Sequence, residues 1–384
     1  MTALATAKLN KSAAAPRMRR LRESGLWLAS FGCVACIVLL VLYSPAAAAG
    51  AREGLLICGQ VVLPTLFPFF VLSALFATLL QRKATLRSST ARLHGLRVME
   101  RLFRQPAAAA GVLLIGLLGG YPMGAKAAAQ LFERSLLTRR QAQCLQLFCF
   151  NAGPAFLIGV VGSALLGSRE AGLLAFASLS LASLALGLGS RLLSPAPGAL
   201  LPPATTASNA QSHTRTLTDS TILGCVTQGV AAALNVCAWV ILFSCVCALL
   251  QFLPAGLRPA IPAANAMLEV SSGVVQAVRA GMPLPVLCAV LGWGGLSVHC
   301  QILGDLRKVG LRLRWFWTAR ALHGGLAAAI CSQLMHWFPP DTPTALTLGS
   351  RSVQLWAISA PAAAALLLFC AFLILDLDLN RKIC

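Results

Sequence analysis

The chain has 384 residues, of which 58% are apolar and only 11% are charged, whereas soluble domains carry about 25% charged residues. Lysine and arginine total 31 against 11 acidic residues, so the formal net charge is +20. A disordered basic protein would lack this apolar content, and a soluble enzyme this apolar could not cover its surface with polar groups. Several runs reach the roughly 20 apolar residues that cross a bilayer. The composition therefore predicts an all-α polytopic membrane protein.

The N-terminal region combines a basic tail over residues 1–25 with an apolar run over residues 26–44. Ala46 to Ala49 resemble a signal-peptidase site, but the run is longer than the roughly 7–15 residues usual for a signal peptide. The length favours a retained transmembrane anchor, and cleavage stays open as the alternative.

Cysteine usage does not indicate a disulfide framework, because nearly all of the 14 cysteines lie in or beside apolar runs. There a free thiol acts as a small hydrophobic side chain. Cys33 and Cys36 have the spacing of redox and zinc sites, but they lie inside the first apolar run without a second pair or a nearby histidine. We therefore expect no metal and no cofactor.

Seven further spans bring the expected number of transmembrane helices to about eight. Two other segments are too polar or too interrupted to cross: residues 106–125, which are broken by glycines and Pro122, and residues 262–283, which hold Glu269 and Arg279. Such segments suit re-entrant hairpins, whose irregular backbone is buried in protein or lines a wet cavity. The seven spans are predicted at 54–80, 143–167, 171–192, 220–252, 284–304, 316–338 and 353–375.

The positive-inside rule supports this topology. With the N-terminus and the C-terminus in the cytoplasm, most of the 31 basic residues are cytoplasmic or at that edge. Treating either broken segment as a full span inverts the following loops and destroys the segregation. The basic residues expected on the outer side of the cell membrane are Arg52, Arg169, Arg258, Arg279 and Arg351.

Under this topology the chain contains two similar units, residues 54–192 and residues 220–338. Each has a span, a loop, a hairpin and two further spans, and the two hairpins enter from opposite sides. This inverted repeat is typical of secondary transporters. Residues 193–219 are rich in Pro, Ala, Ser and Thr and are predicted to form a flexible cytoplasmic linker. The helices at 26–44 and 353–375 are peripheral.

The first hairpin contains Gly120, Tyr121 and Pro122 in a glycine-rich turn. A helix that begins near Pro122 would direct its free amide groups and positive dipole end into a cavity, which suits a polar or anionic ligand. The alternative is a packing turn, where small residues let helices meet.

A second interruption is predicted where Asn151 and Pro154 fall in the middle of an apolar stretch. The proline breaks the helical ladder and exposes carbonyl groups, while Asn151 adds a buried amide. Coordination of a substrate or a cation is one use of such a break, and a simple kink is the other.

Polar residues in the second unit complete the candidate site. Glu269 is the only acid placed at membrane depth, where a charge costs at least about 2.5–3.5 kcal/mol, so we expect substrate binding or proton coupling there. The alternative is a surface pair with Arg279. Ser297 and Gln301 are candidates to hydrogen-bond the substrate, and His299 is a proton-coupling candidate or a packed side chain. Enzyme motifs are absent from the sequence, so we expect no enzyme.

Two motifs carry a resemblance: the run from Gly120 to Lys126, and the Asn-Ala-Gly-Pro-Ala-Phe run that begins at Asn151. Together they resemble the sporulation integral membrane protein family (YlbJ-like), over roughly residues 54–338. That family contains the nucleoside-recognition or Gate domain, which also occurs in concentrative nucleoside transporters and in a ferrous-iron transport protein.

The resemblance implies a membrane protein with a transporter-like core, linked to endospore formation. With the inverted repeat, this leads us to expect a permease for a small polar or anionic solute. The alternative is a non-transporting scaffold for assembly of the spore envelope and cortex. We expect contact with anionic lipid headgroups at the cytoplasmic face and no nucleic acid, and a homo-oligomer stays open. The residues expected to face or shape a central site are Gly120, Tyr121, Pro122, Asn151, Glu269, Ser297 and Gln301.

Overall fold

A computed structural model describes residues 30–31, 34–86, 94–107, 109–191, 220–252 and 254–340. Every regular element in these ranges is helical, which confirms the predicted all-α class. The basic tail at 1–25, the linker at 193–219 and the predicted span at 353–375 lie outside the described residues.

The first elements form one nearly continuous helical rod: α2 (Ser44–Ile57), the π-helix η1 (Cys58–Val62) and α3 (Leu63–Leu86). This corrects the boundaries expected from the sequence, because residues 46–52, predicted to connect two spans, are helical as well. Ala46 to Ala49 are strong helix formers, and Gly50 lets α2 approach the helix at 220–249 closely. A Cβ atom at Gly50 would lie 2.6 Å from the Ser244 carbonyl oxygen.

The remainder of the first unit contains a helical hairpin and an interrupted helix. A capping box of Thr138 and Gln141 starts α7. The helix predicted at 143–167 is interrupted between residues 149 and 154. Pro154 is the N-cap residue of the π-helix that follows. In chain order the elements are α4 (His94–Phe103), α5 (Ala109–Leu118), α6 (Tyr121–Glu133), α7 (Arg139–Phe148), the π-helix η2 (Ala155–Leu165) and α8 (Arg169–Ser190).

The second unit begins with one long helix, α9. A second hairpin is followed by another interrupted helix, whose break contains Gly294 and Gly295. Its elements are α9 (Ser220–Leu249), the 3-10 turns η3 (Leu250–Phe252) and η4 (Ala255–Ala260), α10 (Ile261–Leu268), α11 (Val270–Arg279), α12 (Leu284–Trp293), α13 (Leu296–Gln301), α14 (Leu303–Val309) and α15 (Leu313–Trp337).

Apolar length supports a membrane protein. Within the described part of the chain, 4 helical segments are long and apolar enough to cross a bilayer, and α5 and η2 are shorter apolar helices. The 25 residues of α15 also have the length to cross, but this helix carries Arg314 and Arg320. The 4 segments are Ser44–Leu75, Arg169–Ser190, Ile222–Phe252 and Leu284–Gln301.

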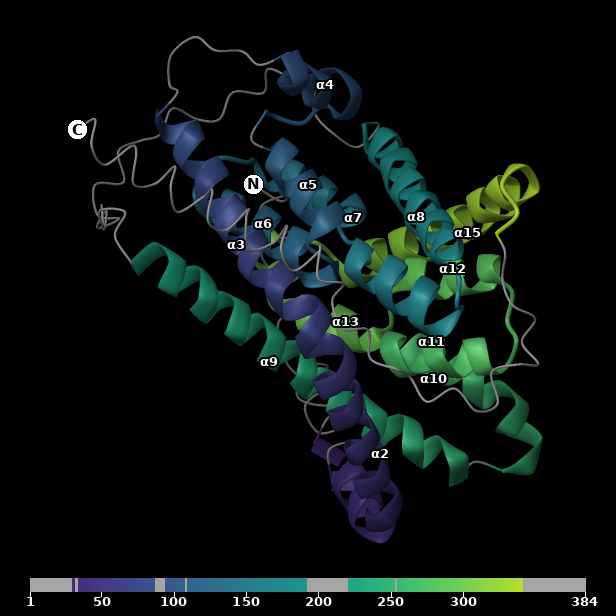
Figure 1. The fold of residues 1–384 in the computed structure, drawn as a ribbon. Helices are drawn as coiled ribbons and strands as arrows, with labels where there is room; N and C mark the ends of the chain where they lie inside the picture. Colours follow the sequence, from purple (N-terminus) through teal and green to yellow (C-terminus); the bar gives the residue numbers. More distant parts are fainter. Residues whose placement is uncertain are drawn as a thin grey trace, which may run out of the picture.

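The two units pack against each other along their long helices. Helix α9 packs on α2 and α3, and α15 packs on α8 and α12 (Figure 1). The largest apolar core contains residues from both units, among them Phe156, Leu179, Val274, Leu287 and Phe316. This shared core holds the hairpins and the interrupted helices close together.

Candidate functional site

The tip of the first hairpin is Gly120, which with Gly119 lies between α5 and α6. Its φ of 86° lies in a region that L side chains rarely adopt. A Cβ atom at Gly120 would lie 3.7 Å from the Gly153 nitrogen. The tip therefore lies against the first break, which is the interruption between α7 and η2. Tyr121 and Pro122 follow directly and begin α6. The expected helix start near Pro122 is therefore present.

The tip of the second hairpin is Glu269, which separates α10 from α11 and is completely buried. Its Oε1 accepts a hydrogen bond from the Ser271 N–H at 3.0 Å, and its Oε2 accepts one from the Ser272 N–H at 2.6 Å. The carboxyl group therefore caps the N-terminus of α11. Its burial excludes the alternative of an exposed surface pair with Arg279.

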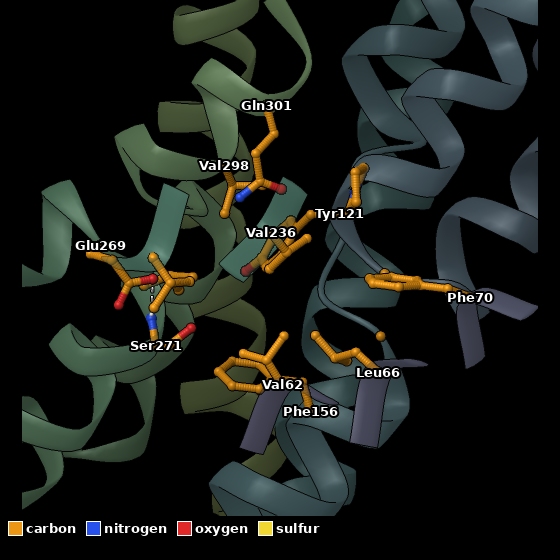
Figure 2. A pocket seen from close by; sticks show the side chains of 15 residues that line it. Val62, Leu66, Phe70, Tyr121, Phe156, Val236, Glu269, Ser271, Val298 and Gln301 are labelled. Carbon is orange, nitrogen blue, oxygen red and sulfur yellow. Dashed lines mark hydrogen bonds between the residues drawn. The ribbon is translucent and has the colours of Figure 1, made fainter. Parts of the chain in front are cut away.

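Both hairpin tips line one pocket with a cavity volume of about 50 Å³ (Figure 2). This cavity has room for roughly four waters. The walls are mostly apolar, so the few polar groups decide what binds. Its lining is Val62, Leu66, Phe70, Gly120, Tyr121, Pro122, Gly153, Phe156, Val236, Val240, Glu269, Val270, Ser271, Val298 and Gln301.

Gln301 is the clearest candidate ligand contact in this pocket. The side chain is 9% exposed, and neither its amide nitrogen nor its amide oxygen has a hydrogen-bond partner among the described residues. Figure 2 shows the carboxamide beside Val298 and Val236. A buried amide without partners is costly, and this one offers both donors and an acceptor to a bound molecule.

Asn151 and Ser297 do not line the pocket. The Asn151 amide donates to the Ser183 hydroxyl at 3.0 Å and to the Phe148 carbonyl at 3.2 Å, so it ties the first break to α8. Ser297 is fully buried, and its hydroxyl has no partner among the described residues. Of the two uses weighed for Asn151, its contacts favour packing at a kink.

His299 is packed into an aromatic cluster. Its Nε2 lies 2.8 Å from the Trp293 carbonyl oxygen. Its ring centroid lies 4.6 Å from that of Trp293, 5.1 Å from that of Phe316 and 5.9 Å from that of Phe150. These contacts favour the packed alternative for His299 over a role in proton coupling.

Arg320 is the functional candidate that sequence reasoning missed, since it was counted at the cytoplasmic edge. The side chain is completely buried, and its guanidinium donates to the carbonyl oxygens of Leu147 and Phe150. It also lies 5.1 Å from the ring centroid of Phe150 and 5.6 Å from that of Phe316. One signal was available: Phe316, Arg320 and His323 share a helical face that is buried.

The second break, between α12 and α13, is contacted by Tyr121 of the first unit. The Tyr121 hydroxyl donates to the Leu291 carbonyl oxygen, near the end of α12. The His323 ring lies deeper, with Nδ1 3.0 Å from the Gly292 carbonyl oxygen and Nε2 3.0 Å from the Leu179 carbonyl oxygen. Side chains from both units therefore meet the carbonyl groups at the end of α12.

Metal ligands do not gather in the described part of the chain, where no group of three or more His, Cys, Asp or Glu side chains could hold an ion. The described cysteines, Cys58 and Cys288 among them, are free thiols.

Comparison with known proteins gives one informative relative. The chain is 28% identical over 328 residues to the sporulation integral membrane protein YlbJ of Bacillus subtilis (strain 168), covering 75% of this chain and 77% of that protein. Family models and solved structures give no match. The relative confirms the resemblance carried by the two motifs: over three quarters of its length, this chain is similar to a sporulation integral membrane protein of the YlbJ type.

Proposed function

We propose that the protein is a secondary-transporter-like permease for a small polar or anionic solute, with a Gate-domain core that acts in sporulation. The observation that carries this proposal is the convergence of both hairpin tips, the first break and α13, the helix after the second break, on one pocket. In many transporters the solute binds between two inverted repeats, at helices that are interrupted. The proposal includes no enzymatic step.

Matching contacts support an inverted repeat. The order span, hairpin, interrupted helix and long helix occurs twice. The segment after the first break, η2, packs on α3 and α11, and the segment after the second break, α13, packs on α9 and α6. Each segment therefore contacts the long helix of its own unit and the hairpin of the other, as expected for two units related by a twofold axis.

The polar groups favour a ligand with a negative or hydrogen-bonding edge. The N-terminus of α11 is already occupied by the Glu269 carboxylate, whereas Gly120 offers no side chain to cap α6. The positive end of α6 is therefore left for a ligand. Gln301 lines the same pocket with an amide that has no partner among the described residues.

The topology that fits this proposal has about eight spans, two re-entrant hairpins and cytoplasmic termini. The positive-inside bias of the sequence supports it, and basic residues at the cytoplasmic edge would contact anionic lipid headgroups. Cysteine accessibility in intact cells tests the orientation. A reagent that does not cross the membrane should label an Arg258→Cys variant and should leave an Arg140→Cys variant unlabelled.

Uptake by the purified full-length protein in liposomes tests the permease. Across a panel of small polar and anionic solutes, we expect wild-type uptake of at least one, and we expect Gln301→Leu to weaken it by roughly 10-fold or more, since a lost hydrogen bond is worth about 1–3 kcal/mol. Gln228→Leu, at an exposed glutamine of α9, should behave as wild type. Absence of uptake across the panel would exclude the proposal.

One observation favours the scaffold alternative. Asn151 and Glu269, both expected to meet a solute, form hydrogen bonds within the protein. A scaffold would co-purify with a stable membrane partner, and its sporulation phenotype would be insensitive to Gln301→Leu. A phenotype that follows the uptake defect of this variant favours the permease.

A further inference from the structure

Three carbonyl groups at the start of the first break are already occupied. A helix end leaves carbonyls without helical partners, and here the oxygens of Leu147 and Phe150 accept from Arg320. The Phe148 oxygen accepts from the Ser183 hydroxyl and from the Asn151 amide. The arginine belongs to α15 of the second unit, so it reaches across the interface between the units to close the break of the first.

The charge of Arg320 has no carboxylate partner among the described residues. Its compensation comes from the negative end of the α7 dipole and from the faces of Phe150 and Phe316. These are the same features, carbonyl oxygens and a helix C-terminus, with which interrupted helices of transporters coordinate a coupling cation. A guanidinium that donates to these oxygens excludes a metal ion both sterically and by charge repulsion.

We propose that Arg320 is a built-in cation that takes the place of a coupling metal ion at the first break, so that the protein functions there without Na⁺ or K⁺. The inference rests on the proposed permease, because coupling has meaning only for a transporter. It assigns Arg320 as a positioning residue: the guanidinium fixes Phe150, whose ring contacts Tyr121 at the hairpin tip.

Thermal unfolding of the full-length protein in detergent tests this directly, in NaCl, KCl and choline chloride at equal ionic strength. We expect wild type to unfold at the same temperature in all three salts. Arg320→Gln should unfold at a lower temperature in choline and regain about 2–4 °C in NaCl or KCl at roughly ten times the dissociation constant of the ion. Arg314→Gln is the matched control, since Arg314 lies on the same helix and is exposed.

Two outcomes overturn the proposal. Stabilisation of wild type by Na⁺ or K⁺ over choline would mean that a metal site coexists with Arg320. An unfolding temperature of Arg320→Gln that is lowered equally in all three salts would mean that the arginine only stabilises the fold. If Arg320→Gln does not fold, Arg320→Lys is measured instead. Because lysine keeps the positive charge, its unfolding temperature should be the same in all three salts. A higher unfolding temperature of Arg320→Lys in NaCl would contradict the proposal.

Unfolding requires no solute, so this result is independent of whether a transported solute is found. Once uptake is measured, replacing Na⁺ by choline on both sides should change the rate of wild type by less than about twofold. A loss of uptake on replacement would contradict the built-in cation while leaving the permease itself in place.

Discussion

Each of the two interrupted helices has carbonyl groups that lack helical partners, and the two helices differ in how the break is stabilised. The first break, between α7 and η2, ends at Pro154, and its carbonyls are satisfied by the charged Arg320 and by Ser183. The second break uses Gly294 and Gly295, with φ of 89° and 74°, and its Leu291 carbonyl accepts from a neutral hydroxyl. The first break is stabilised by a charged side chain from the other unit, and the second by backbone conformations that glycine permits.

This difference matches what each break contributes to the pocket. The first supplies Gly153 and Phe156, which are backbone and apolar surface, whereas the second supplies Val298 and the unpartnered amide of Gln301. The first break is therefore the more fixed support, and the second carries the side chain best suited to a ligand. Three substitutions test this contrast.

The largest effect is expected for Gly124→Ala in α6, at the contact of this helix with the first break. A Cβ atom there would lie 1.9 Å from the Cys149 carbonyl oxygen and 2.7 Å from the Gly116 Cα. Both are backbone atoms of packed helices, so we expect a loss of about 3 kcal/mol or failure to fold. The measurement is the thermal unfolding temperature in detergent, with Gly159→Ala as control, because nothing lies within 4 Å of that Cβ position. Wild-type stability of Gly124→Ala would show that the first break is not rigid.

A smaller loss is expected at the second break, for Gly294→Ala. The φ of 89° should cost an alanine about 1–2 kcal/mol, and its Cβ would lie 3.1 Å from ring atoms of Phe150 and Tyr121. The same unfolding assay measures it, with Gly304→Ala in open space of α14 as control. If Gly294→Ala and Gly304→Ala unfold at the same temperature, the second break does not depend on a positive φ.

The smallest loss is expected for Tyr121→Phe, which keeps the ring and leaves the Leu291 carbonyl without its donor. A buried neutral hydrogen bond contributes about 1 kcal/mol, whereas removing one side of a buried charged contact costs about 3–5 kcal/mol. Tyr121→Phe should therefore destabilise less than Arg320→Gln when both are compared in choline chloride. The reverse order would overturn the contrast between an ionic and a neutral closure.

Local chemistry was predictable from the sequence. Composition predicted a helical membrane protein, and the two motifs predicted the resemblance that the Bacillus relative confirms. The turn at Gly120 and the interruption at Pro154 were also predictable, because glycine and proline act through their own backbone. The connection expected near residue 50 was helical instead, because close packing of α2 on α9 continues the helix.

The direction of each polar side chain was not predictable. Asn151 lies in the expected break, but its amide contacts α8 rather than the pocket, and this depends on how the helices cross. The positive-inside rule counts arginines along the chain and does not detect that Arg320 faces the protein interior. The stripe of Phe316, Arg320, His323 and Ala327 on one face of α15 carried that information.

Glu269 and Arg320 are buried side chains of one unit, the second, and they carry opposite charges when both are ionised. A membrane potential of 100 mV acts on each unit charge with about 2.3 kcal/mol. A rigid movement of the second unit carries both charges together, so the forces that the potential exerts on them oppose each other. A translation that moves both groups through the same depth therefore transfers no net charge from this pair across the membrane.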